Sequence, residues 1–243
     1  MREQEEFYLI PSSIPLREAW QKALPLYFDN FLLFVGVLLV AQVAAEILNF
    51  FLVLEGQPLF IRLLASLPGL ALVSMGYYAL VQAVTERSYG EPITLLEALG
   101  YSFAMLGPIL LTNLVLLGVL LLPLAVLLVA SIPLALLLGG LGSLVAGVGG
   151  GAVLGSFFAF VPFVLVAEGR YGWSAIRRSF ELTKREWGKV AITMIAVLLP
   201  PLILDRAFEE SWVVFLLQAL YEPLPLIVLA ELYRSARAQL GEL

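Results

Sequence analysis

Long apolar stretches separated by short polar segments form the dominant pattern along this chain. The apolar stretches cover residues 31–51, 63–84, 105–166, 190–204 and 212–232. An α-helix crosses the hydrocarbon core of a bilayer, about 30 Å thick, with roughly 20 apolar residues. The stretch 105–166 contains no charged residue over about 60 positions, which is enough for more than one crossing. The pattern therefore predicts several transmembrane helices.

The positive charges indicate how many spans there are, because cytoplasmic loops of membrane proteins collect Lys and Arg. If the stretch 105–166 holds two spans, all of the 14 basic residues except Arg62 and Arg206 fall on one side of the membrane. Three spans there would place the cluster from Arg170 to Lys189 opposite the basic residues that precede the first span. We therefore expect an all-α integral membrane protein with six transmembrane helices and both termini in the cytoplasm.

Composition agrees with this class and excludes several others. The chain is 61% hydrophobic and 14% charged, whereas a soluble domain carries about 25% charged residues. It has no Cys and no His, which excludes disulfides, Cys or His metal ligands and His-dependent catalytic triads. A net charge of −5 argues against a nucleic-acid partner. We expect no metal and no cofactor, membrane lipids as partners, and a multi-pass location in the cytoplasmic membrane.

Three similar segments precede the first, third and fifth predicted spans. They are residues 16–24, 95–103 and 172–180, and their aligned alanines are Ala19, Ala98 and Ala175. At the start of the second segment, Thr94 and Glu97 have the spacing of a capping box, which starts a helix. The repeat predicts a single membrane domain of three units, 12–90, 91–169 and 170–243, each an interfacial helix followed by a transmembrane hairpin.

The third of these segments is amphipathic and basic. Trp173, Ile176 and Phe180 fall on one face of the predicted helix. Four basic residues surround that face: Arg177, Arg178, Lys184 and Arg185. They have two interpretations, which the sequence leaves open. They bind anionic lipid headgroups or a cytosolic protein partner, or they only fix the topology.

The stretch 161–184 resembles a family of six-span prokaryotic membrane proteins related to the membrane domain found on some glycerophosphoryl diester phosphodiesterases. The matching motif is a span, Glu-Gly, a small helix, then Ser-Phe-x-Leu-Thr. Its positions here include Glu168, Gly169, Ser179, Leu182 and Thr183. The resemblance implies a six-span fold and no reaction. The catalytic His of the phosphodiesterase barrel has no counterpart in this chain, which lacks histidine.

Glu222 is the acidic residue that the pattern places deepest in a span. It follows Trp212 by about ten residues, so at about 1.5 Å per residue it lies roughly 15 Å deep. Gln218 lies one turn away, and Pro223 and Pro225 favour a break in the helix. Ionisable groups in spans are costly and therefore indicate function. We interpret Glu222 as a proton- or cation-coupled site, or as a neutral acid hydrogen-bonded between helices.

Further polar residues occupy the first and third spans. Gln42, Glu46 and Asn49 share one helix face. They line a polar cavity, or Glu46 is an acid at the membrane–water interface. Asn113 is expected to make an interhelical hydrogen bond.

Glycines interrupt the long apolar stretch between residues 139 and 155. Gly147, Gly151 and Gly155 have the small-xxx-small spacing that lets helices approach closely. The expected role is close packing within the chain or between copies in a homo-oligomer.

Three functions are compatible with these features. The first is a non-enzymatic membrane protein that binds anionic lipid or a protein partner at its cytoplasmic face. The second is a transporter or channel for small solutes or ions that uses an intramembrane carboxylate. The third, an intramembrane enzyme acting on lipid, has few residues to build it from, so we expect no enzymatic activity.

Overall fold

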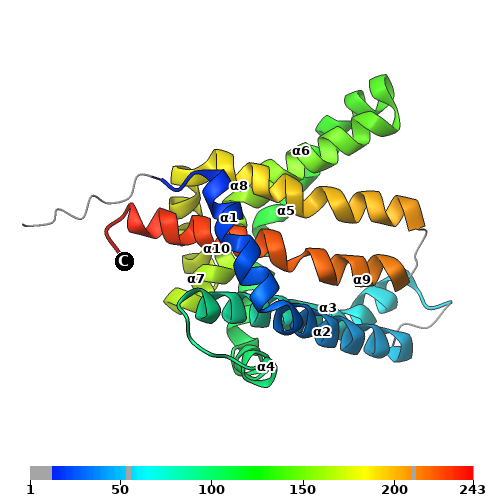
Figure 1. The fold of residues 1–243 in the computed structure, drawn as a ribbon. Helices are drawn as coiled ribbons and strands as arrows, with labels where there is room; N and C mark the ends of the chain where they lie inside the picture. Colours follow the sequence, from blue (N-terminus) through cyan, green and yellow to red (C-terminus); the bar gives the residue numbers. More distant parts are fainter. Residues whose placement is uncertain (1–12, 53–55, 209–211, 243) are drawn as a thin grey trace, which may run out of the picture.

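A computed structural model describes residues 13–52, 56–208 and 212–242, and these form helices joined by short turns (Figure 1). Within them, six helices are long and apolar enough to cross a membrane. They are Phe31–Leu52, Phe60–Ser88, Leu106–Pro133, Ala146–Glu168, Trp173–Leu204 and Leu216–Ala238. The all-α class is thus confirmed, and so are six helices that could span a membrane, two of them in the stretch 105–166.

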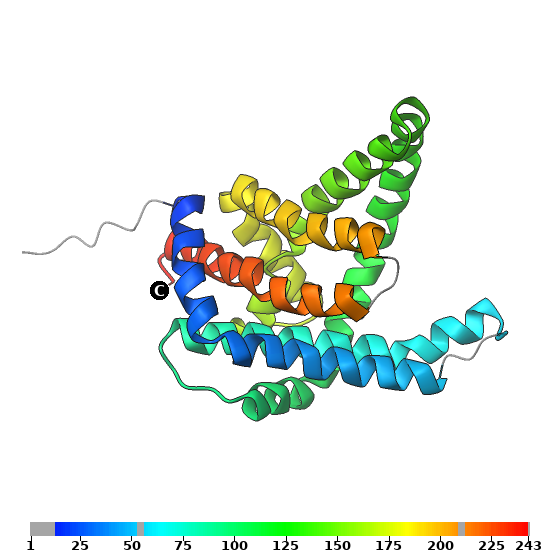
Figure 2. The same ribbon diagram turned by 45° about the vertical axis from the view of Figure 1, so that its right-hand side comes forward.

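The helices follow one another as three hairpins, and the ends at which the two helices of each hairpin connect lie toward the same end of the bundle (Figures 1 and 2). The first set is α1 (Leu16–Asp29), α2 (Phe31–Leu52) and α3 (Leu59–Ser88). The second is α4 (Leu95–Ala104), α5 (Leu106–Leu138), α6 (Gly140–Phe158) and α7 (Val161–Glu168). The third is α8 (Trp173–Phe208), α9 (Trp212–Tyr221) and α10 (Pro223–Ala238).

Each predicted interfacial segment is helical and precedes a hairpin. In the third set this segment and the following span form one helix, α8, with non-helical backbone angles at Glu186. The aligned alanines Ala19, Ala98 and Ala175 are all fully buried. So are the residues four positions later, Ala23, Ser102 and Ser179. Small side chains at these positions let each segment lie close against the bundle; the division into three repeats stays a prediction.

The predicted capping box is present at the start of α4. The Glu97 backbone N–H donates to the Thr94 hydroxyl at 3.3 Å, and the Glu97 carboxylate accepts from the Thr94 backbone N–H at 2.7 Å. The carboxylate also accepts from the Thr94 hydroxyl at 2.8 Å. These bonds, the one from the backbone first, hold the pKa of the Glu97 carboxyl below its ordinary value.

Pro123 and Pro133, in the middle of the long apolar stretch, do not interrupt its first helix. Helix α5 continues through Pro123 and Pro133 and ends at Gly139. Gly139 adopts a positive φ of 59°, a backbone region that favours glycine. Prolines are tolerated within transmembrane helices, where neighbouring groups satisfy the freed backbone carbonyls.

The glycines of α6 face α8 in two of the three predicted positions. A Cβ placed on Gly151 would lie 3.3 Å from Leu198, and one placed on Gly155 would lie 2.9 Å from Met194. Nothing lies within 4 Å of the same position on Gly147. Gly151 and Gly155 therefore allow close packing of α6 on α8 within the chain.

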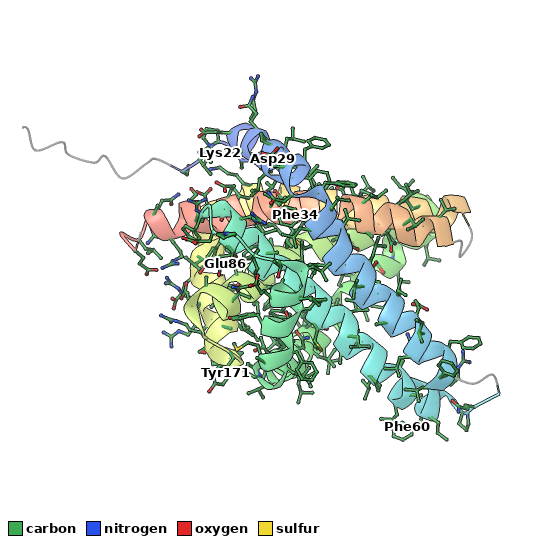
Figure 3. The ribbon with its side chains drawn as sticks, turned by 60° about the horizontal axis from the view of Figure 1, so that its bottom comes forward. Lys22, Asp29, Phe34, Phe60, Glu86 and Tyr171 are labelled. Carbon is green, nitrogen blue, oxygen red and sulfur yellow. The ribbon has the colours of Figure 1, made fainter. Side chains whose placement is uncertain are left out.

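Polar groups from distant parts of the chain gather at the end of the bundle opposite the hairpin turns. The Lys189 ammonium donates to the Ile14 carbonyl at 2.6 Å, and Arg234 donates to the Ser88 carbonyl at 3.4 Å. Glu86 and Tyr171 lie toward this end and Phe60 lies at the other (Figure 3). Because the stretch 105–166 holds two long helices, as the basic residues indicated, these segments lie at one end of the bundle.

Candidate functional site

A cavity of about 390 Å³ lies among α2, α3, α5, α6, α7, α8 and the segment from Glu222 into α10. Its polar lining comes from all three hairpins: Gln42, Ser74, Tyr77, Tyr78, Asn113 and Glu222. Apolar side chains complete the wall: Val73, Leu116, Phe158, Val161, Pro162, Val197, Leu226 and Leu229. A few convergent polar groups in a largely apolar cavity are typical of a small-molecule site.

Glu222 enters this cavity from the point where α9 ends and α10 begins. The expected break at Glu222-Pro223 is slight, because Glu222 keeps helical backbone angles and its N–H donates to the Gln218 carbonyl at 2.8 Å. The nearby Leu220 carbonyl accepts a hydrogen bond from the Tyr27 hydroxyl at 2.6 Å. Within the described part of the chain, the Glu222 carboxylate makes no hydrogen bond and no ion pair. It is therefore free to bind a ligand.

Gln42 faces Glu222's cavity from α2 with an unused acceptor. Its Oε1 atom is buried and has no hydrogen-bond partner among the described residues. A buried acceptor without a partner is costly. Asn113 accepts from the Tyr78 hydroxyl at 3.5 Å, so the expected interhelical hydrogen bond of Asn113 is present at the long limit of hydrogen bonding.

The other polar residues predicted with this site lie outside its lining. Gln218 is half-buried, and Glu46 is exposed on the outer side of α2. Asn49 packs against α3, where a Cβ placed on Gly69 would lie 2.3 Å from the Asn49 Oδ1 atom. Of the face formed by Gln42, Glu46 and Asn49, only Gln42 reaches the cavity.

Sequence reasoning missed the contribution of α3. Ser74, Tyr77 and Tyr78 line the cavity and stand at i, i+3 and i+4 within an otherwise apolar span. This spacing puts three hydroxyl groups on neighbouring positions of one helix face. The spacing of these three hydroxyl-bearing residues in the sequence was the signal that could have predicted their part in the cavity.

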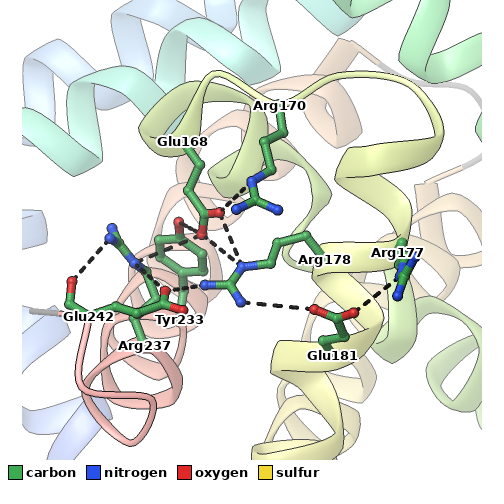
Figure 4. Close-up of polar contacts among 8 residues, drawn as sticks. All are labelled: Glu168, Arg170, Arg177, Arg178, Glu181, Tyr233, Arg237 and Glu242. Atoms are coloured by element: carbon green, nitrogen blue, oxygen red, sulfur yellow. Dashed lines mark hydrogen bonds and ion pairs between the residues drawn. The ribbon is translucent and has the colours of Figure 1, made fainter.

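A second polar cluster, around Glu168, holds the end of the bundle opposite the hairpin turns (Figure 4). Glu168 ends α7, and its carboxylate accepts from the Arg178 Nε at 3.1 Å and from the Tyr233 hydroxyl at 2.9 Å. Arg170 pairs with it at 3.2 Å. The Arg178 guanidinium also binds Glu242, which follows α10. Arg178 thus joins α8 to α7 and to the segment after α10.

The remaining family-motif residues fasten the first part of α8 to the same region. Ser179 donates to the Phe157 carbonyl at 2.9 Å, and Thr183 donates to the Ser156 carbonyl at 3.1 Å. Leu182 is fully buried. Gly169 has a φ of 64° and turns the chain after α7. These positions hold a helix against the bundle, and none of them lines the cavity.

The four predicted lipid- or partner-binding residues have different environments. Arg178 is 8% exposed at its side chain, whereas Arg177 is 76% exposed and pairs only with Glu181, at 3.2 Å. Lys184 and Arg185 are exposed, and the Lys184 ammonium lies 4.6 Å from the centre of the Phe180 ring. Three of the four therefore face outward, and Arg178 is held inside the protein.

Glu186, at the bend of α8, is a buried acid that the sequence did not single out. Its carboxylate pairs with Lys189 at 2.7 Å and accepts from Ser235 at 3.1 Å and from Gln239 at 2.5 Å. The bend is thus tied to α10. No three acidic side chains among the described residues come together as a metal site would require.

Comparison with known proteins adds no relative: no protein-family model, no curated protein and no solved structure matches the chain. The resemblance to the phosphodiesterase-associated membrane domain is not supported by these comparisons. What stands is a polytopic membrane protein with six candidate membrane-spanning helices.

Proposed function

We propose that this membrane protein is a transporter that binds a small solute in the cavity around Glu222. The observation that carries the proposal is a carboxylate that has no hydrogen-bond or ion-pair partner among the described residues and lines a cavity to which all three hairpins contribute. Uncompensated ionisable groups within a membrane are costly, and they mark substrate or ion pathways. Substrate sites of many transporters lie near the middle of the bilayer, between helices of different repeats.

The alternative, binding of anionic lipid at the cytoplasmic face, has weaker support for its central residue. Arg178 already pairs with Glu168 and Glu242, so a lipid phosphate would have to displace them. Arg177, Lys184 and Arg185 remain exposed for this role, next to the exposed aromatic rings of Trp173 and Trp187. Aromatic and basic side chains together favour the headgroup layer.

The transporter proposal is tested by the reach of water into the cavity from each side. The chain has no cysteine, so Ser74→Cys introduces a single thiol into the lining. We expect a membrane-impermeant methanethiosulfonate reagent to modify it in right-side-out and in inside-out vesicles, because a carrier opens its site alternately to the two sides. Labelling from one side only, or from neither, contradicts transport.

Two control variants calibrate this experiment. Leu128→Cys lies on α5 at a side chain that is 70% exposed on the outside of the bundle, where lipid excludes the reagent. Glu91→Cys lies in the exposed turn before α4 and reports maximal labelling from the side that we assign to the cytoplasm.

Native mass spectrometry tests the lipid alternative separately. We expect Lys184→Ala/Arg185→Ala to lose retained anionic lipid if α8 binds headgroups, while Arg17→Ala/Lys22→Ala on α1 keeps it. Equal retention in the wild type and both double variants would show that the basic residues of α8 only fix topology.

A further inference from the structure

We propose that the solute is an organic ammonium ion, a primary amine on a short apolar chain, and that it exchanges with a proton on Glu222. This inference rests on the proposed function and names its substrate class. It follows from the balance of charges and hydrogen-bonding groups in the cavity, from the aromatic lining, and from the single carboxylate.

The cavity offers acceptors and a negative charge without a counter-charge. Glu222 supplies a carboxylate that has no hydrogen-bond or ion-pair partner in the part of the chain that the structure describes. Gln42 adds a neutral amide to the lining. The Asn113 Oδ1 accepts one hydrogen bond, from Tyr78, and retains a second lone pair. No Lys or Arg is among the lining residues. An anion would therefore lie beside the Glu222 carboxylate without a counter-charge, whereas a cation with N–H donors would pair with that carboxylate.

The walls favour an organic cation over a metal ion. Hard metal ions such as Ca²⁺ take six to eight oxygen ligands at about 2.3–2.6 Å, and this lining is mostly carbon. Aromatic rings from Tyr77, Tyr78 and Phe158 contribute to the wall, and the face of such a ring attracts an ammonium group. Leu226 and Leu229 add apolar surface, against which the carbon chain of the amine can pack.

A single carboxylate makes proton and ammonium binding mutually exclusive. An ionised carboxylate without a cation is costly within the membrane, so Glu222 carries either a proton or the ammonium ion. When the ammonium enters, the Glu222 O–H bond breaks and the proton leaves to water, and the charge of the cavity is unchanged. The other titratable groups of the lining are the phenols of Tyr77 and Tyr78 on α3. The remaining elements contribute only neutral groups, so one proton leaves for each amine.

Calorimetric titration of the purified protein tests this inference with three probes of equal chain length: butylammonium, butanol and butyrate. We expect butylammonium to bind most tightly. Titrations in two buffers of different ionisation enthalpy should show release of about one proton per site in the pH range where Glu222 is protonated. Glu222→Gln should weaken butylammonium binding at least about tenfold, because it removes a charge-assisted interaction, and should abolish proton release. Glu46→Gln, an exposed acid of α2, serves as the matched control and should bind as the wild type does.

The possible failures are distinguishable. Binding of butanol or butyrate as tight as that of butylammonium would overturn the cationic class but leave a solute site in the cavity. Butylammonium binding that survives Glu222→Gln would overturn the exchange with this carboxylate. Absence of binding by all three probes, with Ser74→Cys labelled from both sides, would overturn the substrate class alone. Absence of that labelling would overturn the proposed function itself.

Discussion

Arg177 and Arg178 are adjacent in sequence, yet their replacement by Ala should have very different effects on stability. The Arg178 side chain is 8% exposed and pairs with Glu168, with Glu242 and, at 4.0 Å, with Glu181. Arg177 is 76% exposed and, among the described residues, pairs with Glu181 alone. Removing one partner of a buried ion pair costs about 3–5 kcal/mol, because it leaves the other charge buried and unpaired. A surface pair contributes about 0–1 kcal/mol.

The remaining contacts of Glu168 place the expected cost of Arg178→Ala at the lower end of that range. Glu168 keeps its hydrogen bond from Tyr233, its ion pair with the half-exposed Arg170 and a longer ion pair, at 3.8 Å, with Arg237. Glu242 is 36% exposed, so water solvates part of its charge. We therefore expect Arg178→Ala to lower the free energy of unfolding by about 3 kcal/mol, and Arg177→Ala to lower it by less than about 0.5 kcal/mol.

Unfolding in mixed micelles by added dodecyl sulfate, followed by tryptophan fluorescence, measures both values. A double-mutant cycle with Glu168→Gln should yield a coupling to Arg178 of about 1–3 kcal/mol and none to Arg177. The reasoning is refuted if the two arginine variants differ by less than about 0.5 kcal/mol, because burial and pairing would then not decide the cost.

Two further predictions concern helix packing and helix capping. Gly76→Ala should destabilise the protein by about 1–3 kcal/mol, because its Cβ would lie 2.2 Å from that of Ala41. The control Gly118→Ala, whose Cβ would have nothing within 4 Å, should be neutral or slightly stabilising in the same micelle unfolding experiment. Equal losses of stability in the two variants would contradict the clash. Thr94→Ala should cost about 1 kcal/mol through loss of the α4 cap, which thermal unfolding measures. The pKa of Glu97 is lowered in the folded state, so its contribution is present above the ordinary carboxyl pKa and is lost as the pH falls through the lowered value. Thermal unfolding between pH 6 and pH 3 should show a pH dependence that is smaller in Glu97→Gln, and an unchanged dependence would exclude this role.

The candidate site was predicted from the sequence only in part. Glu222 and Gln42 were singled out because polar residues in apolar spans are conspicuous along the chain. Their meeting with Ser74 and Tyr77 in one cavity was not predicted, because residues from separate hairpins meet only through helix packing. Glu46 was grouped with Gln42 by spacing, but the helix face they share is broad enough for one to line the cavity and the other to face outward.

The sequence by itself determined the helical class, the six spans and the gathering of basic residues at one end. These properties follow from transfer of each segment into lipid and from the charge of each loop, which depend mainly on local composition. Only the tertiary structure decided that Arg178 is enclosed while Arg177 is exposed, since adjacent residues on a helix point about 100° apart. It also decided that Glu222 has no hydrogen-bond or ion-pair partner among the described residues and lines one cavity with Gln42 and Asn113, because partners for a polar side chain come from whichever helices pack beside it.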